Sequence, residues 1–138
     1  MEPQRIAVGI VRLGDRFLVG TRLPGQAMAG LAEFPGGKLL PGETVHAGLL
    51  REIMEETGLM VKVGEWSMEV EHVYPHGHCR ITFVECLATD EREPKEPFRW
   101  LTLSVMEALE FPAGNKVMWQ QYRHERLNKT KTSPRETG

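Results

Sequence analysis

The chain has 138 residues, which is enough for one domain with its own core and too few for two. Hydrophobic residues make up 41% of it and charged residues 26%, and the net charge of −2 gives no general attraction to nucleic acid or to an anionic membrane. No apolar run approaches the roughly 20 residues that a membrane-spanning helix needs, and the first residues lack the apolar core of a secretory signal. We therefore expect a cytoplasmic protein without a nucleic-acid or membrane partner.

The N-terminal third is predicted to form short strands separated by turns. Residues 5–13 are mostly apolar and β-branched, which is typical of a strand buried on both faces. A Gly-Asp turn separates them from a second strand at 16–21, so we expect a hairpin. A short extended piece at 31–34 follows a loop rich in Gly, Pro and Ala and ends in a turn at 35–37.

A helix is predicted in the middle of the chain, with Thr44 suited to cap its N-terminus and Gly58 suited to end it. At about 100° per residue, one helical face is apolar and should pack on a sheet, while another face presents carboxylates outward. The apolar face holds Leu50, Ile53, Met54 and Thr57, and the acidic face holds Glu52, Glu55 and Glu56.

The second half of the chain should supply further strands at 60–73, 80–89 and 98–103, a short helix at 105–109 and a final helix at 115–127. Gly64 suggests a bulge or a turn in the first of these strands, and Ser104 is suited to cap the short helix. Residues 1–127 then form a single domain, and 128–138 form a polar tail that we expect to be disordered. Because most strands are joined as hairpins around one central helix, we expect an α+β or α/β sandwich with a mixed sheet.

The acidic face of the central helix needs an explanation. Three carboxylates within five residues repel one another, at a cost of a few tenths of a kcal/mol for each neighbouring pair. A helix that was merely solvated would more often interleave these charges with Lys. An external cation is therefore our interpretation, and a solvated acidic face is the alternative.

The segment 37–59 places defined residue types at fixed spacing, which makes it a specific pattern. These residues are Gly37, Glu43, Arg51-Glu52-Ile53, Glu55-Glu56 and Gly58-Leu59. At every defined position the segment resembles the Nudix hydrolase signature. The resemblance implies an α/β/α sandwich with a mixed sheet and a loop-helix catalytic motif. It also implies an enzyme that hydrolyses a nucleoside diphosphate linked to another group, with Mg²⁺, or alternatively Mn²⁺, as cofactor.

The resemblance assigns catalytic roles to the acidic face. Glu55 and Glu56 are the expected principal metal ligands, with the Gly36 carbonyl as a third. Glu52 is expected to be a ligand or the base that orients the attacking water.

Two further positions complete the implied catalytic site. Arg51 is expected to fix the loop and the helix by pairing with Glu43 rather than by touching the metal. The family also has an additional Glu in the loop before its Trp-bearing strand, and this chain has no acid at the usual distance before Trp100. Glu96 is expected to supply this metal ligand, with Glu93 as the alternative.

A narrower likeness runs from about residue 5 to residue 122. The stretches RIAVGIVR at 5–12, EFPGGK at 33–38 and FPAGN at 111–115 are similar to the MutT-like branch, which hydrolyses oxidised guanine nucleotides such as 8-oxo-dGTP. The substrate-binding residues that this likeness implies are Arg22, Phe34, Gly37, Lys38 and Asn115.

Three of these side chains also have simpler interpretations. Asn115 would read the purine edge, because its amide both donates and accepts hydrogen bonds, or it would cap a helix. Phe34 would lie against the base or belong to the core, and Arg22 would reach the substrate or be exposed without a role. The turn at 74–80 lacks the purine-contacting basic position of the branch, so the identity of the base stays open.

The remaining reactive residue types favour structural interpretations. A transition-metal site would use His72, His76, His78 and Cys79, but a polar hairpin tip is the commoner explanation of such a cluster. Cys79 and Cys86 should point to opposite faces of one strand, which excludes a mutual disulfide. Trp66 and Trp119 are expected in the core or at an interface.

Taken together, the sequence predicts a Mg²⁺-dependent nucleoside triphosphate pyrophosphohydrolase of the MutT type, which removes oxidised purine nucleotides from the nucleotide pool. The first alternative is the same reaction on pyrimidine nucleotides, such as CTP or modified dCTP. The second is a Nudix-fold regulator that binds a nucleotide without hydrolysing it, which the intact set of carboxylates disfavours. Both a monomer and a homodimer remain open.

Overall fold

A mixed β-sheet forms the centre of the structure, a computed structural model that describes residues 3–75, 77–89 and 91–128. Its strands are β1 (Gln4–Leu13), β2 (Arg16–Thr21), β3 (Ala32–Glu33), β4 (Gly36–Lys38), β5 (Val61–Tyr74), β6 (Gly77–Ala88) and β7 (Arg99–Thr102). The main path is β3-β2-β1-β6-β5, with β4 paired to β1 and β7 paired to β2. Because β1 and β6 run parallel and the other pairs antiparallel, the expected mixed sheet is confirmed.

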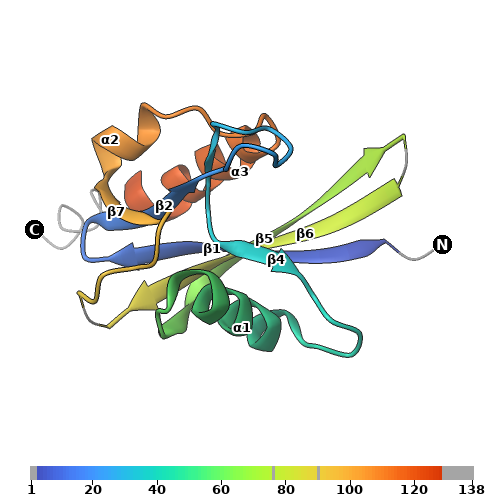
Figure 1. Ribbon diagram of the computed structural model, residues 1–138, viewed down its shortest axis with the longest axis horizontal. Helices are drawn as coiled ribbons and strands as arrows, with labels where there is room; N and C mark the ends of the chain where they lie inside the picture. Colours follow the sequence, from blue (N-terminus) through green and yellow to red (C-terminus); the bar gives the residue numbers. More distant parts are fainter. Residues whose placement is uncertain (1–2, 76, 90, 129–138) are drawn as a thin grey trace, which may run out of the picture.

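Helices cover both faces of this sheet (Figure 1). On one face lies α1 (Val45–Thr57), and on the other lie α2 (Leu103–Glu107) and α3 (Asn115–Tyr122), which continues into π-helical turns at Arg123–Asn128. The predicted α/β/α sandwich is therefore confirmed. None of the helices in the described part of the chain is long and apolar enough to cross a membrane.

Both ends of α1 are set by the residues that its sequence indicates. The Thr44 side chain accepts a hydrogen bond of 3.1 Å from the Ala47 amide. At the other end Gly58 adopts the left-handed conformation, with φ of 78°, and its amide bonds back to the Met54 carbonyl. These local contacts fix where the acidic face begins and ends.

The buried face of α1 includes Leu49, which was not predicted to lie there, whereas the predicted Leu50 is half-buried and Met54 is exposed. Leu49, Ile53 and Thr57, spaced four apart, are fully buried against the sheet, whereas Met54 is 40% exposed. Residues four apart lie nearly in line along a helix, and Met54 is turned away from that line by about 100°. Met54 therefore belongs to the rim of the interface and not to its centre.

Several boundaries in the second half of the chain also differ from the prediction: β6 begins at Gly77 instead of residue 80, and the short helix spans Leu103–Glu107 instead of 105–109. α2 begins at Leu103 with Thr102 as its N-cap instead of Ser104, because Thr102 still has the extended backbone of β7. Asn128 belongs to the π-helical turns, and the rest of the expected tail, at 129–138, lies outside the described residues. The single-domain boundary at residue 127 stays a prediction.

One edge of β1 is shared by two strands. Residues 6–8 of β1 pair with β4, and Arg12 and Leu13 pair with β2. The segment at 36–38 was expected only as a turn, but the Gly9 amide bonds to the Pro35 carbonyl (2.8 Å) and aligns the segment along β1. The loop that leads into α1 is therefore anchored at the middle of the sheet.

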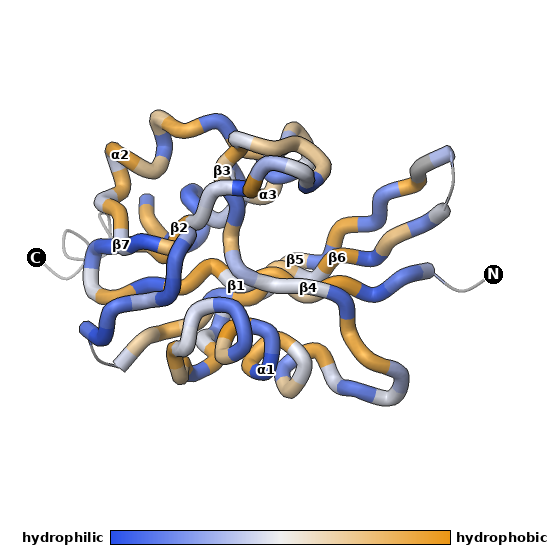
Figure 2. The backbone as a smooth tube through the Cα atoms, viewed as in Figure 1, coloured by the Kyte–Doolittle hydropathy of each residue, from blue (hydrophilic) through white to orange (hydrophobic). Residues whose placement is uncertain are grey.

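Side chains from β1 alternate between two cores, as expected for a strand buried on both faces. Ala7 and Val11 pack in the core beneath α1, and Ile10 packs in the core beneath α2 and α3. Trp66 and Trp119 lie in or against the second core, so their predicted structural role is confirmed. Hydrophobic residues accordingly concentrate in the middle of the sheet, where β1 and β6 run side by side (Figure 2).

Candidate active site

Gly36 and Gly37, here called the glycine pair, lie where the sheet meets α1. A Cβ atom added to Gly36 would lie 2.2 Å from the Ala7 carbonyl oxygen, and one added to Gly37 would lie 2.6 Å from Glu52 Oε2. Only glycine permits approaches this close. The glycine pair is therefore in contact with β1 on one side and with the acidic face of α1 on the other.

The three carboxylates of α1 have different environments. Glu56 Oε1 accepts a hydrogen bond of 2.9 Å from the Gly36 amide. The Glu52 side chain is 17% exposed and lies over Gly37, whereas the Glu55 side chain is 59% exposed. Two carboxylates thus point to the glycine pair and the third points to solvent.

Arg51 joins the acidic face to the loop that precedes the helix. Its guanidinium donates two hydrogen bonds to Glu43, of 2.7 and 2.9 Å, which confirms the predicted pair. It also donates to Glu52 at 3.1 Å, to Glu55 at 3.2 Å and to the Lys38 carbonyl at 3.3 Å. The hydrogen bonds from Arg51 are the main reason why the pKa of Glu43 falls to about 2.

Glu56 has a strongly perturbed acid–base equilibrium. Burial raises the pKa of its carboxyl group to about 7, and the hydrogen bond from Gly36 opposes this shift. The negative charges of Glu52, Glu33 and Glu55 raise the pKa further. The other three carboxylates are therefore close enough to disfavour the charged form of Glu56.

This donor set fits a hard divalent cation. The carboxylates offer only oxygen atoms, which Mg²⁺ prefers, and a cation would relieve their mutual repulsion. In the described part of the chain no three His, Cys, Asp or Glu side chains are grouped closely enough to hold a metal ion. Their present partners are Arg51 for Glu52 and Glu55, and the Gly36 amide for Glu56. The Gly36 carbonyl as a metal ligand stays a prediction.

The glycine pair also lines a cavity of about 220 Å³ on the α2–α3 side of the sheet. The cavity brings Arg22, Phe34 and Asn115 together with the glycine pair, although these residues come from separate parts of the chain. Lys38, also predicted to bind substrate, is exposed and does not line it. The apolar part of the lining consists of Ile6, Val8, Ile81, Phe83 and Pro112.

Glu33 lines the same cavity and was not among the predicted residues. Arg22 Nη1 lies 3.0 Å from Glu33 Oε1, and Arg22 Nε donates to the Ala27 carbonyl at 2.6 Å. Burial raises the pKa of Glu33, and the charge of Arg22 opposes this rise. Arg22 is thus held in place by two contacts. In the sequence, only its position next to Phe34 could have indicated that Glu33 belongs to the site.

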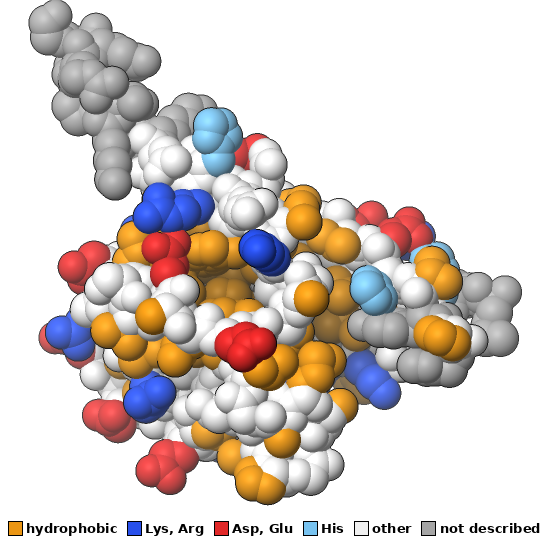
Figure 3. All heavy atoms as spheres, turned by 90° about the horizontal axis from the view of Figure 1, so that it is seen from above, with side chains coloured by type: hydrophobic (Ala, Val, Ile, Leu, Met, Phe, Trp, Pro, Cys, Tyr) orange, Lys and Arg blue, Asp and Glu red, His pale blue; other side chains and the backbone are white. Residues whose placement is uncertain are grey.

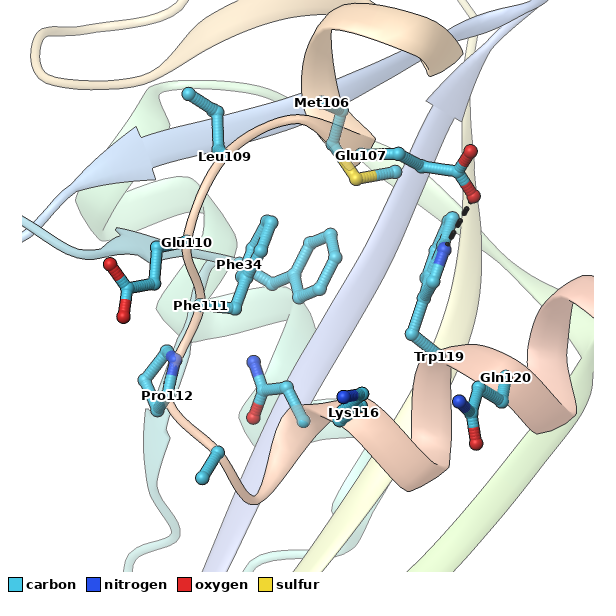
Figure 4. A pocket seen from close by; sticks show the side chains of 12 residues that line it. Phe34, Met106, Glu107, Leu109, Glu110, Phe111, Pro112, Lys116, Trp119 and Gln120 are labelled. Carbon is cyan, nitrogen blue, oxygen red and sulfur yellow. Dashed lines mark hydrogen bonds between the residues drawn. The ribbon is translucent and has the colours of Figure 1, made fainter.

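A larger hollow of about 460 Å³ adjoins the cavity and shares Phe34, Pro112 and Asn115 with it. Viewed from the α2–α3 side, the surface is hollowed over a hydrophobic floor, with charged side chains around the rim (Figure 3). Phe34 and Phe111 stack inside this hollow with ring centroids 4.8 Å apart, and Trp119 faces them (Figure 4). Phe34 therefore belongs both to the core and to the wall of the cavity.

The loop at 91–98 packs against the C-terminal end of α1. The Lys95 amide bonds to the Thr57 carbonyl at 3.0 Å, and the Lys95 ammonium group reaches the Glu55 carbonyl at 3.2 Å. Glu93 and Glu96 are both exposed in this loop. The loop is thus next to the acidic helix, and the choice of Glu96 as an additional metal ligand stays a prediction.

The histidine and cysteine residues of the β5–β6 hairpin take part in other contacts. His78 Nε2 lies 2.5 Å from Glu71 Oε2 on the neighbouring strand, and His76 lies outside the described residues. Cys79 and Cys86 are buried and free, so the prediction of no mutual disulfide is confirmed. These contacts favour the interpretation of a polar hairpin tip.

Comparison with known proteins gives the same assignment as the geometry. A family model described as NUDIX domain matches residues 7–121. The chain is 33% identical over 121 residues to an 8-oxo-dGTP diphosphatase of Escherichia coli (strain K12), with 84% of this chain and 93% of that protein covered. It is 34% identical over 134 residues to an 8-oxo-dGTP diphosphatase of Haemophilus influenzae, with 91% and 93% covered.

One further relative matches a shorter part of the chain, and a solved structure is similar over most of it. A CTP pyrophosphohydrolase of Escherichia coli (strain K12) is 35% identical over 66 residues, which is 48% of this chain and 49% of that protein. The structure of a MutT protein from Methanosarcina mazei Go1 is similar with a TM-score of 0.73 and 21% identity, covering 91% of this chain and 97% of that one. Because the family model matches most of this chain, the chain belongs to the Nudix hydrolase family and is an enzyme that hydrolyses nucleotide pyrophosphate bonds.

Proposed function

We propose that this enzyme is a Mg²⁺-dependent nucleoside triphosphate pyrophosphohydrolase that converts 8-oxo-dGTP to the monophosphate and pyrophosphate. One observation carries the proposal: the glycine pair lies between the carboxylates of α1 and the cavity that contains Phe34 and Asn115. A nucleotide whose base fills this cavity would pass its phosphates over the glycine pair towards the acidic face. The 8-oxo-dGTP diphosphatases to which the chain is similar over most of its length support the same substrate.

The acidic face would hold the cation through Glu52, Glu55 and Glu56. When bound, Mg²⁺ supplies charge neutralisation for the phosphates and increases the acidity of a coordinated water. Glu52, held in place by Arg51 and by its contact with Gly37, is suited to orient the attacking water and accept its proton. The Arg51–Glu43 pair fixes this geometry without being part of the chemistry.

At the other end of the site, polar groups would read the base. The Asn115 amide has both a donor and an acceptor, which matches a purine edge where oxidation at C8 has converted N7 from an acceptor to a donor. Phe34 supplies a flat apolar surface for the base. Arg22, fixed by Glu33, would add a positive charge at the rim.

The catalytic assignment is tested with Glu55→Gln. Since the Glu55 side chain is 59% exposed, the variant should fold like the wild type, while turnover with Mg²⁺ falls by at least about a hundredfold. Glu65→Gln, which removes an exposed carboxylate on β5, is the matched control and should keep wild-type turnover. Full activity of Glu55→Gln would refute the metal assignment, and removal of divalent cations by a chelator should abolish turnover of the wild type.

The substrate is tested with a panel of 8-oxo-dGTP, dGTP, CTP and 5-methyl-dCTP, assayed for release of pyrophosphate. The partial match to a CTP pyrophosphohydrolase makes a pyrimidine substrate the second candidate. A preference for CTP over 8-oxo-dGTP by more than about tenfold, or 1.4 kcal/mol, would reject the purine. Tight binding of a nucleotide without turnover would point to a regulator instead.

A further inference from the structure

Glu85 is a carboxylate in β6 that is only 1% exposed and that lines neither the acidic face nor the two cavities. A buried charge is costly unless it is paired and hydrogen-bonded. The Tyr122 hydroxyl donates to Glu85 Oε2 at 2.7 Å. Arg126 Nη2 lies 3.0 Å from Glu85 Oε1, and Arg12 Nη1 lies 3.7 Å from Oε2. A hydroxyl group and two guanidinium groups thus converge on one carboxylate in the middle of the sheet.

The neighbouring strand is shaped to accommodate this carboxylate. A Cβ atom at Gly64 would lie 3.0 Å from both the carbonyl oxygen and the Oε1 atom of Glu85. The pairing of β5 with β6 shifts register between Val63 and Ser67 while β5 continues, so of the bulge and the turn expected at this glycine the structure favours the bulge. The contact with Glu85 explains the bulge: it moves β5 away from a charged side chain that the sheet encloses.

Tyr122 connects Glu85 to the nucleotide cavity through aromatic contacts. Its ring stacks on Trp119, with centroids 5.2 Å apart, and Trp119 lies 6.0 Å from Phe34 in a near-parallel arrangement. Asn115, Trp119 and Tyr122 are spaced four and three residues apart, so they share one face of α3. Asn115 and Tyr122 are about 10 Å apart along the helix axis. Any rotation of α3 that moved Tyr122 off Glu85 would therefore turn Asn115 and Trp119 by the same angle.

We propose that Glu85, acting through Tyr122, is a positioning residue that fixes the rotation of α3 and thereby sets Asn115 and Phe34 against the nucleotide base. The inference rests on the proposed function, in which these two residues contact the base. Glu85 touches neither substrate nor metal. It provides a directional contact at the C-terminal end of α3, in addition to the hydrogen bonds that Trp119 and Arg123 donate to Glu107.

The test variants change the contact from either side, and the Glu85 variants also alter the pairs with Arg12 and Arg126. Tyr122→Phe removes only the hydroxyl and keeps the ring that stacks on Trp119. Glu85→Ala removes the carboxylate, and Glu85→Gln keeps an acceptor for the hydroxyl and serves as the conservative rescue. Val84→Ala, one residue away but packed in the core beneath α1, is the control for a general loss of stability.

We expect Tyr122→Phe and Glu85→Ala to raise KM for 8-oxo-dGTP and to reduce its discrimination over dGTP by about fivefold or more. Because the acidic face is untouched, kcat should stay within about twofold. Glu85→Gln should lie closer to the wild type, and Val84→Ala should keep the wild-type discrimination.

A second readout does not depend on hydrolysis. Amide hydrogen exchange at residues 115–122 should be faster in Tyr122→Phe than in the wild type, with exchange in α1 unchanged. The proposal would be overturned if Tyr122→Phe and Glu85→Ala kept the wild-type discrimination. Unchanged amide exchange in α3 would also overturn it, as would an equal loss of discrimination in Val84→Ala. If the wild type does not hydrolyse 8-oxo-dGTP, the proposed function fails instead, and exchange in α3 still decides whether Glu85 fixes that helix.

Discussion

Gly37→Ala should displace the Glu52 carboxylate without destabilising the fold. The added Cβ atom would lie 2.6 Å from Glu52 Oε2, whereas ordinary contacts begin near 3.4 Å. The carboxylate must therefore move by about 0.8 Å or more. Since the clashing atoms are at the end of a flexible side chain, the fold should absorb this movement, and the free energy of unfolding should change little.

Catalysis should be much more sensitive than stability. A displacement of about 1 Å at a reacting group costs on the order of a hundredfold in rate, which corresponds to about 2.7 kcal/mol in activation free energy. We therefore expect kcat for 8-oxo-dGTP to fall by about that factor, while KM changes much less, because Phe34 and Asn115 at the base end of the cavity are unchanged. Steady-state kinetics with saturating Mg²⁺, together with thermal unfolding, measure the two effects separately.

Gly77→Ala is the matched control, because a Cβ atom at this position meets no atom within 4 Å and should alter neither quantity. Wild-type kcat in Gly37→Ala would show that the position of the Glu52 carboxylate over Gly37 is not required. A large loss of stability would show that the glycine is needed for folding rather than for room at the site.

Two further predictions follow from the same region. Gly36→Ala should fail to give folded protein on expression, because its Cβ atom would lie 2.2 Å from the backbone oxygen of Ala7, which has no room to move. A folded variant that unfolds like the wild type would contradict this prediction. Glu43 has its pKa lowered from 4.5 to about 2, so its contribution to stability is full above pH 4.5 and is lost as the pH falls towards 2. Between about pH 6 and pH 3, the free energy of unfolding measured with urea should thus fall more for the wild type than for Glu43→Gln. An equal fall in both proteins would show that the Arg51–Glu43 pair does not stabilise the fold.

The parts of the structure that the sequence predicted depend on contacts between near neighbours. Thr44 and Gly58 cap α1 because capping needs only the adjacent backbone. Arg51 reaches Glu43 within the same loop and helix, eight residues away, so the spacing of the motif already implied the pair. For the same reason the acidic face could be derived from helical periodicity alone.

The features that the sequence missed depend on pairing between distant segments. The strand β4 exists because Gly36–Lys38 finds an unpaired edge of β1, and no local pattern marks three residues that include two glycines as a strand. Glu33 became part of the site because β3 pairs with β2, which places Glu33 beside Arg22. Glu85 is visible in the sequence as one charge in an apolar strand, but its partners Tyr122 and Arg126 lie about forty residues away.

This difference in sequence separation explains why the reaction is easier to infer than the substrate. The end of the site that we propose for the phosphates is built from residues 36–56, whose geometry a single loop and helix determine. The base end combines strand residues from β1 and β6 with Arg22 and Asn115, so it depends on sheet register and on the rotation of α3. A small turn of that helix changes which groups face the base while the acidic face stays as it is. On the proposed function, base preference should therefore depend on packing across the whole sheet rather than on the catalytic motif.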